Sequence, residues 1–268
     1  MKIWHQSFTV LNKLTDYKKE LSNHLNKVKR STTTISMNGM NDKTYLTEYP
    51  GNDIKYSYYS KLHSNQFLVN AIKAENDGYD AFMISSLPDP ALLDTRTVVN
   101  IPVTGYGETA IAFSSFLGRR FGILLFIEEL IPLLEHNVTS YGFNDKKASI
   151  KHVGFTFNDV DFNNSSKIID IFCESAKKMI REEGAEVIIP GEAVLCTLLA
   201  KEGINRIDNV PILDVISVLV KITEIMVELK KDHNIEVCSR GYFNEKPPKK
   251  RTIEILNFYG LDKLYNFE

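Results

Sequence analysis

The stretch GAEVIIPGEA, residues 184–193, ends a strand of buried character on an acidic residue. Residues 186–190 form a short apolar run that is typical of a strand buried in a parallel sheet. Gly184 before it matches the glycine that commonly ends a helix. Glu192 follows within two residues, so a carboxylate stands at the tip of the predicted strand. We therefore interpret Glu192 as a candidate catalytic residue, with a helix-capping carboxylate as the alternative.

A second stretch, GYDAFMISS at residues 78–86, aligns with residues 184–192 without gaps, at an offset of 106. Each stretch is followed by a helical segment and then by a short strand that contains proline, near residues 101 and 210. Such repetition predicts two similar α/β halves related by a pseudo-twofold axis. Chance likeness between two βαβ units is the alternative.

Short apolar runs alternate with longer helical patterns along the whole chain, which indicates an α/β fold built of parallel βαβ units. Residues 166–183 have an apolar stripe opposite lysine and glutamate, which predicts a helix. Residues 39–59 have neither period, so we predict a long loop there. The predicted strands are residues 2–7, 32–38, 81–86, 101–105, 121–126, 150–157, 186–190 and 210–214.

The repeat predicts a first domain of residues 1–104 plus 210–268 and a second domain of residues 105–209. Ligands of open parallel sheets bind outside the carboxyl ends of the strands, so Ser86 and Glu192 are expected on opposite walls of one cleft. Each is expected at the start of a helix, with Asp89 and Pro90 beginning the helix after Ser86. The unpaired backbone N–H groups at these helix starts favour an anion.

The composition points to a small-molecule substrate rather than a nucleic-acid or membrane partner. The net charge is −2, and no apolar stretch reaches the roughly 18 residues of a spanning helix. The first residues lack the order of a signal peptide. Three cysteines without close pairing suggest neither disulfide bonds nor a zinc knuckle. We expect a cytoplasmic protein, and the sequence leaves open whether it forms a homo-oligomer.

Three stretches in order resemble the Asp/Glu/hydantoin racemase superfamily: GYDAFMISSLPDPALLDTRTVVNIPVTGYGETA (78–110), FLGRRFGILLF (116–126) and EEGAEVIIPGEA (182–193). The resemblance covers most of the chain. It implies two flavodoxin-like, three-layer α/β domains with mainly parallel sheets, an active site in the interdomain cleft, and neither cofactor nor metal. It also implies a cysteine at the tip of each equivalent strand, one acting as acid and one as base. Ser86 and Glu192 stand at these two positions.

This departure from the family pattern predicts a one-sided site. Glu192 is a competent general base, whereas a serine without a partner base is a poor proton abstractor near neutral pH. We therefore assign Glu192 and Ser86 to the catalytic site, with Ser86 as a donor to the substrate. The backbone N–H groups of Leu87 and Ala193 are expected to stabilise the developing oxyanion.

Further candidates for substrate binding surround this pair. The resemblance places polar substrate-binding residues at His5 and Gln6 and a cleft residue at Glu108. Arg240 and Tyr242, in SRGYF, are candidates for closing over the cleft and pairing with an anion, with a surface salt bridge as the alternative. A metal site of His5, Glu108 and Glu192 is conceivable from the strand ends alone, but no ligand spacing requires it.

The resemblance implies an enzyme that transfers a proton in a small carboxylate, amide or hydantoin-like cyclic imide, as a racemase or epimerase does. Hydrolysis of a cyclic amide or imide, with Glu192 activating water, is the alternative, as is a decarboxylase or isomerase. A small-molecule binding protein that has lost the chemistry is the non-enzymatic alternative. The aromatic-rich YPGNDIKYSYY (49–59) is interpreted as a lid over the substrate or as an interface patch.

Overall fold

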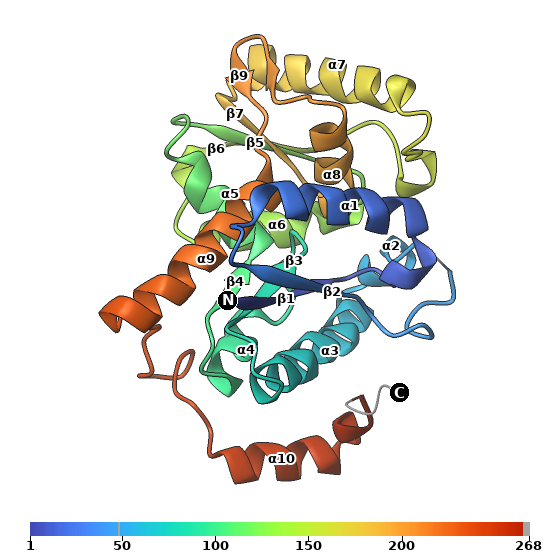
Figure 1. The fold of residues 1–268 in the computed structure, drawn as a ribbon. Helices are drawn as coiled ribbons and strands as arrows, with labels where there is room; N and C mark the ends of the chain where they lie inside the picture. Colours follow the sequence, from blue (N-terminus) through green and yellow to red (C-terminus); the bar gives the residue numbers. More distant parts are fainter. Residues whose placement is uncertain (48, 265–268) are drawn as a thin grey trace.

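Two parallel β-sheets lie one above the other, with helices between them and on their outer faces (Figure 1). The computed structural model describes residues 1–47 and 49–264. Buried apolar side chains of both sheets belong to one continuous core. The mainly parallel, layered α/β architecture predicted from the sequence is confirmed.

The first sheet has the strand order β2-β1-β3-β4, and every neighbouring pair is parallel. Its strands are β1 (Lys2–Ser7), β2 (Thr34–Asn38), β3 (Ala81–Ser85) and β4 (Val103–Gly105). Helices α1 (Thr15–Val28) and α9 (Val215–His233) cover one face, and α3 (Ser57–Asn76) covers the other (Figure 1). Covered on both faces, β3 buries all five of its residues, which is why its sequence is almost entirely apolar.

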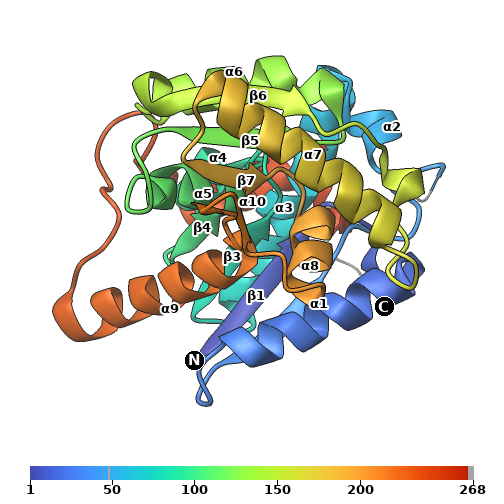
Figure 2. The same ribbon diagram turned by 90° about the horizontal axis from the view of Figure 1, so that it is seen from above.

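The second sheet has the order β6-β5-β7 and is also parallel. Its strands are β5 (Phe121–Leu125), β6 (Lys147–His152) and β7 (Val187–Pro190). Helix α7 (Ser166–Glu183) lies across the outer face of this sheet (Figure 2). It ends at Gly184, whose left-handed conformation (φ 69°) stops the helix and turns the chain into β7, as the sequence predicts.

The two sheets have the same internal order, which gives the sequence repeat a structural counterpart. β1 and β5 lie centrally, β2 and β6 lie on one side of them, and β3 and β7 lie on the other. β4 pairs with β3 on its outer side, and Ile212 forms an isolated parallel bridge to Ile188 in the corresponding place beside β7. β3 and β7 therefore occupy the same position in their sheets, and their carboxyl ends lie at corresponding edges of the two halves.

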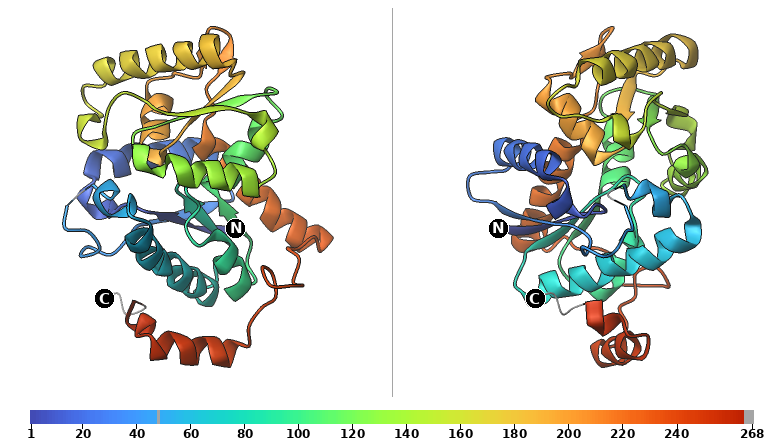
Figure 3. Two further views of the ribbon diagram at one scale, coloured as in Figure 1. Left: turned by 180° about the vertical axis from the view of Figure 1, so that it is seen from behind. Right: turned by 90° about the vertical axis from the view of Figure 1, so that its right-hand side faces the viewer.

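The remaining elements connect and cover the sheets. Helix α8 (Ala193–Lys201) packs against α1, and α5 (Tyr106–Ser114) packs against α9, so these pairs join the two halves. Helix α10 (Lys249–Phe258) lies beyond α3, far from the second sheet (Figure 3). The other elements are α2 (Gly51–Ile54), α4 (Leu92–Val98), α6 (Ile131–Ser140), α10 (Lys249–Phe258), the hairpin β8 (Arg206–Ile207) and β9 (Val210–Pro211), and 3-10 turns at Leu11–Lys13, Glu128–Leu130, Asn144–Lys146, Phe157–Asp159 and Leu261–Leu264.

Three local predictions are wrong. The loop predicted at residues 39–59 contains α2 and the start of α3. The strand predicted at 150–157 ends at His152, because the chain turns at Gly154 (φ 103°). The strand predicted at 210–214 is only the two-residue β9, paired antiparallel with β8. The two strand predictions fail because a left-handed backbone or a tight hairpin outweighs the local apolar pattern, and the loop prediction fails because these helices lack an apolar period.

Among the described residues, no helix combines the length and the apolar character that crossing a membrane requires. The domain division at residues 104 and 210 stays a prediction.

Candidate active site

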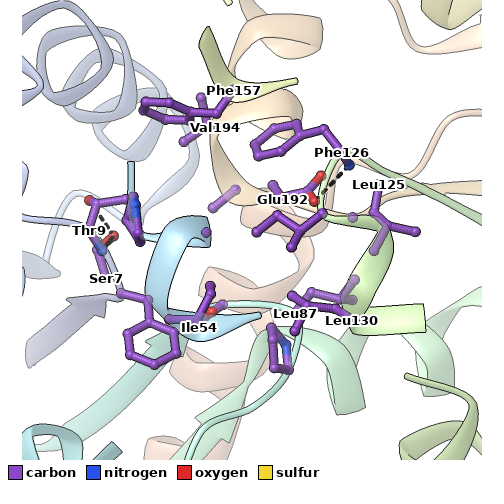
Figure 4. A pocket seen from close by; sticks show the side chains of 18 of the residues that line it. Ser7, Thr9, Ile54, Leu87, Leu125, Phe126, Leu130, Phe157, Glu192 and Val194 are labelled. Atoms are coloured by element: carbon purple, nitrogen blue, oxygen red, sulfur yellow. Dashed lines mark hydrogen bonds between the residues drawn. The ribbon is translucent and has the colours of Figure 1, made fainter. Parts of the chain in front are cut away.

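A pocket lies where the carboxyl ends of β1, β3, β5 and β7 converge, between the two sheets (Figure 4). The centres of water-sized spheres fit within about 60 Å³ of this pocket, and its whole empty space, open mouth included, is about 570 Å³. The lining residues are Ser7, Phe8, Thr9, Tyr17, residues 49–51, Ile54, Ser85, Ser86, Leu87, Pro88, Leu125, Phe126, Ile127, Leu130, Phe157, Gly191, Glu192, Ala193 and Val194. This is the place where open parallel sheets bind their ligands.

Glu192 enters this pocket from the second sheet, at the residue that precedes α8. Its carboxylate does not cap α8; instead, Oε1 accepts the N–H of Phe126 at 2.9 Å (Figure 4). Oε2 is buried and has no hydrogen-bond partner among the described residues. Burial raises the pKa of Glu192 to about 8, against the opposing effect of the backbone N–H groups of Phe126 and Ile127. At neutral pH the side chain is therefore mostly protonated, and it ionises near pH 8.

Ser86 and Leu87 also line the pocket, as predicted from their strand tip, but the helix after them starts later than expected. β3 ends at Ser85, the chain passes through a turn, and α4 begins only at Leu92. The expectation that Ser86 lies at a helix start is therefore wrong. This turn is held by hydrogen bonds between Asp89 and residues far along the chain, which the local sequence does not show.

Asp89 fixes this turn to the start of α5. It is buried, with φ 50°, and its carboxylate accepts the N–H groups of Gly107 (2.9 Å) and Glu108 (2.6 Å). The hydroxyl of Tyr141 donates to the same carboxylate at 2.8 Å. Burial raises the pKa of Asp89 to about 7. The wall of the pocket at Leu87 and Pro88 thus depends on a buried carboxylate outside the pocket.

Several predicted substrate-binding residues lie outside the pocket lining. Gln6 faces α3 and accepts the side-chain N–H of Asn70 at 3.0 Å. His5 is fully buried, and burial lowers its pKa to about 4, so its ring is neutral. Glu108 forms a two-pronged ion pair with Arg96, at 2.9 and 2.5 Å.

Arg240 and Tyr242 follow α9 in an exposed segment, and neither is part of the pocket lining; the side chain of Tyr242 is 91% exposed. Cys196, one turn after Glu192, is buried against Asp214, with a distance of 3.7 Å from Sγ to Oδ1. Burial raises the pKa of this thiol to about 12, so it stays protonated at neutral pH. In the part of the chain that the structure describes, no three His, Cys, Asp or Glu side chains gather as metal ligands would.

The pocket contains groups that sequence reasoning missed. Ser7 and Thr9, at the end of β1, hold their hydroxyls 2.8 Å apart (Figure 4). Tyr17 reaches the pocket from α1, and its position in a helix gave no signal beyond an ordinary core residue. Tyr49 stacks on Phe157 with ring centres 5.0 Å apart, so the segment before α2 closes an aromatic wall against the second half. Only the aromatic content of residues 49–59 hinted at this wall.

Fold and site together define a class: a layered α/β protein whose pocket, between two matched parallel sheets, contains a carboxyl group at a strand tip. The family model described as Asp/Glu/Hydantoin racemase matches residues 25–223, and the chain belongs to this family. The predicted superfamily is thereby confirmed, as is the predicted class of enzyme, a racemase-superfamily isomerase.

Known relatives agree with this assignment. A hydantoin racemase of Pseudomonas sp. (strain NS671) is 28% identical over 206 residues, which cover 76% of this chain and 79% of the relative. A hydantoin racemase of Paenarthrobacter aurescens is 28% identical over 201 residues, covering 74% and 81%. The solved structure of allantoin racemase from Klebsiella pneumoniae has a TM-score of 0.74 at 18% identity, covering 93% of this chain and 94% of that one. It shares the fold.

Proposed function

We propose that this chain transfers a proton at a carbon beside a carbonyl group of a small, neutral cyclic amide or imide, as a racemase or epimerase acts on a hydantoin-like ring. Glu192 is the acid and base of this reaction. The observation that carries the proposal is the lining of the pocket: Glu192 is the one carboxylic acid among the described lining residues, and it stands in an otherwise apolar and hydroxyl-bearing surround. The hydantoin racemases among the relatives supply the substrate class.

The lining also bears on the choice between amino acids and uncharged rings. No lysine, arginine, histidine or aspartate belongs to the described lining. A zwitterionic amino acid would therefore bury its ammonium and carboxylate groups without ionic partners, which is costly. A neutral ring needs only hydrogen bonds and apolar contact, and both are present. This supports a cyclic amide or imide over a free amino acid.

The chemistry follows from the state of Glu192. Its ionised form takes the proton from the carbon, the electron pair moves into the carbonyl group, and an enolate oxygen forms. The protonated form returns a proton to the carbon. A pKa of about 8 suits both steps, because each form is populated near neutral pH. We assign three hydrogen-bond donors to the substrate. They are the Ser86 hydroxyl and the Leu87 N–H after β3, and the Ala193 N–H after β7.

One observation favours a second candidate. Since Glu192 is the single carboxylic acid of the described lining, proton transfer from two opposite faces lacks an evident second base. Hydrolysis of a cyclic amide, or decarboxylation, needs a proton-transfer residue on one side only. These reactions therefore remain the alternative within the same pocket.

Incubation of the enzyme with one enantiomer of 5-benzylhydantoin in D₂O separates these reactions. We expect deuterium to replace the hydrogen at the reacting carbon, followed by NMR, together with loss of optical rotation. Exchange with full retention of configuration would indicate one-sided proton transfer. Ring opening that incorporates ¹⁸O from water would favour the hydrolase. Tight binding of the ring with neither exchange nor turnover would contradict an enzymatic role.

The aromatic wall predicts how the substituent of the ring is bound. We expect Tyr49→Ala to raise KM for 5-benzylhydantoin by about tenfold, because it removes one member of the stacked pair and opens the pocket to water. The exchange rate at saturating substrate is expected to change much less. Tyr58→Ala is the matched control, since Tyr58 is 69% exposed in the same region and lies outside the lining. An unchanged KM in Tyr49→Ala would exclude the wall from substrate binding.

A further inference from the structure

Three of the buried polar atoms that have no hydrogen-bond partner within the described residues belong to the lining of this one pocket. They are the hydroxyl of Tyr17, the hydroxyl of Ser85 and Oε2 of Glu192. A buried polar atom without a partner destabilises a folded protein, so such atoms are rare and call for an explanation. The other such atoms are both ring nitrogens of His5, Oγ1 of Thr95 and Oδ1 of Asp262, which lie outside this lining. In the pocket, a bound ligand can supply the missing partners.

Two of these three atoms come from the first half of the molecule. Ser85 is the last residue of β3 and pairs in register with Ser7 of the neighbouring β1, so both side chains lie on one face of the sheet. Tyr17 lies in the first turn of α1, which covers that face, and its side chain is only 3% exposed. Glu192 stands on the other half. The first half therefore presents hydroxyls where the second presents a carboxyl group.

The hydroxyl of Tyr17 lies near that of Ser7 but makes no hydrogen bond of normal geometry to it or to any other described residue. Ser7 is the neighbouring polar side chain, but its own hydroxyl is engaged with Thr9, both with the Thr9 hydroxyl at 2.8 Å and with the Thr9 N–H at 3.1 Å. The ring of Tyr17 packs beside Phe162, with centroids 6.1 Å apart, which holds its direction. Burial raises the pKa of Tyr17 far above the physiological range, so the phenol keeps its proton. It is therefore a hydrogen-bond donor and not a base.

We infer that Tyr17 and Ser85 donate hydrogen bonds to the substrate oxygen on which negative charge develops, in addition to the donors at the tip of β3. This inference rests on the proposed function. When Glu192 takes the proton from carbon, the C–H electron pair moves into the carbonyl group and the oxygen becomes an enolate. Both hydroxyls keep their protons and only shorten their hydrogen bonds. The return of the proton from Glu192 reverses each change.

This role explains why a one-carboxylate pocket can act on a weakly acidic carbon. Donors that are fixed before the reaction and shielded from water stabilise developing charge without reorganisation. The turn after β3 places Ser86 away from a helix start, so the first half lacks the helix N–H groups that the second half has at α8. On this wall, side-chain hydroxyls therefore supplement the single backbone donor at Leu87.

The test measures hydrogen exchange at the reacting carbon of 5-benzylhydantoin in D₂O for Tyr17→Phe and Ser85→Ala. We expect each variant to exchange about 10²–10³-fold more slowly at saturation, the usual loss for one oxyanion donor, with KM changed less than about threefold. Tyr79→Phe is the matched control, because the Tyr79 hydroxyl pairs with the Ser36 hydroxyl at 2.9 Å and lies outside the lining. An exchange rate near that of the wild type in Tyr17→Phe would overturn the inference.

Thermal unfolding supplies an independent readout. Removal of an unpaired buried hydroxyl leaves nothing unsatisfied, so Tyr17→Phe and Ser85→Ala are expected to keep or raise Tm. Tyr79→Phe removes a paired hydroxyl and is expected to lower it. A fall of Tm in Tyr17→Phe as large as in Tyr79→Phe would show that the Tyr17 hydroxyl is engaged inside the protein, which contradicts the inference.

The failure of the proposed function can be told from the failure of this inference. If the wild type does not exchange the probe, calorimetry with 5-benzylidenehydantoin, whose corresponding carbon is planar, measures the donors directly. Binding at least tenfold weaker in Tyr17→Phe than in the wild type would then support the donors and reject only the reaction. Equal affinity of the two proteins, or no binding by the wild type, would overturn the donor role.

Discussion

Replacement of Glu192 by glutamine is expected to lower the rate of proton exchange by about 10²–10⁴-fold, the range that positioned acid–base groups contribute. The amide has nearly the same size and keeps an oxygen that accepts the N–H of Phe126. It has no proton to trade, however, so chemistry stops while the pocket keeps its shape. Binding of 5-benzylhydantoin, followed by calorimetry, is expected to change less than about fivefold, since the ring is neutral.

The same substitution is expected to stabilise the protein, with a definite pH dependence. The pKa of Glu192 rises from its ordinary 4.5 to about 8 on folding, so between these values the folded state holds a proton that the unfolded state has lost. Stability conferred by the wild-type side chain therefore falls as pH rises from about 4.5 to 8. We expect the denaturation midpoint of Glu192→Gln to exceed that of the wild type by more at pH 8 than at pH 4.

The exchange rate of the wild type gives a further check. If the ionised form of Glu192 abstracts the proton, the rate at saturating substrate rises with pH toward a plateau above about 8. Glu182→Gln is the matched control, because Glu182 is exposed on α7 and forms a single ion pair of 4.0 Å with Lys178. Substantial activity in Glu192→Gln would reduce Glu192 to a structural residue and leave the proposed chemistry without its base.

The two strand tips show what the sequence can predict. GYDAFMISS and GAEVIIPGE give β3 and β7 to within one residue, because a strand covered on both faces must be continuously apolar. Ser86 and Glu192 follow these strands and line one pocket, as topology requires. The resemblance to a known family added the family and the mainly parallel α/β fold, both of which are confirmed. The apolar run that defines each strand lies within a few consecutive residues, so the sequence alone predicts it.

Tyr17 and Tyr49 show what the sequence could not predict. Each lies far along the chain from both strand tips, and each reaches the pocket only because α1 and the segment before α2 fold over it. A tyrosine at a buried helix position has the same pattern whether its hydroxyl is satisfied or free. Gln6 illustrates the opposite case, because alternation along β1 turns it toward α3 and away from the lining. His5 shares the face of Ser7 but lies two residues before the end of β1 and is fully buried. Contacts between segments distant in sequence determine which of these side chains line the pocket.

Asp89→Ala is expected to destabilise the protein by about 3–5 kcal/mol, the range for removing one partner of a buried charged network. Three donors lose their acceptor: the N–H groups of Gly107 and Glu108 and the hydroxyl of Tyr141. Alanine must also adopt φ 50°, which costs about a further 1 kcal/mol for a residue with a Cβ. Urea denaturation followed by circular dichroism measures this loss.

Asp89→Asn and Asp94→Ala define what the carboxylate contributes. Asparagine tolerates the left-handed backbone and keeps one acceptor oxygen, so we expect a loss of about half that of alanine. Asp94 lies in the first turn of α4, where its side chain is exposed, and its removal is expected to cost less than about 0.5 kcal/mol. A loss below about 1 kcal/mol in Asp89→Ala would mean that water or a rearranged turn satisfies the three donors.

The effect of Asp89 on activity separates positioning from chemistry. Its carboxylate holds the turn that carries Leu87 and Pro88. The backbone of Gly107 packs closely against this turn, because a Cβ on Gly107 would lie 2.3 Å from the Leu87 carbonyl oxygen. We therefore expect Asp89→Asn to raise KM and lower kcat together, because the wall of the pocket moves. The pH at which the rate rises is expected to stay at that of Glu192, since Asp89 exchanges no proton with the substrate. A shift of that pH in Asp89→Asn would instead couple the two carboxyl groups directly.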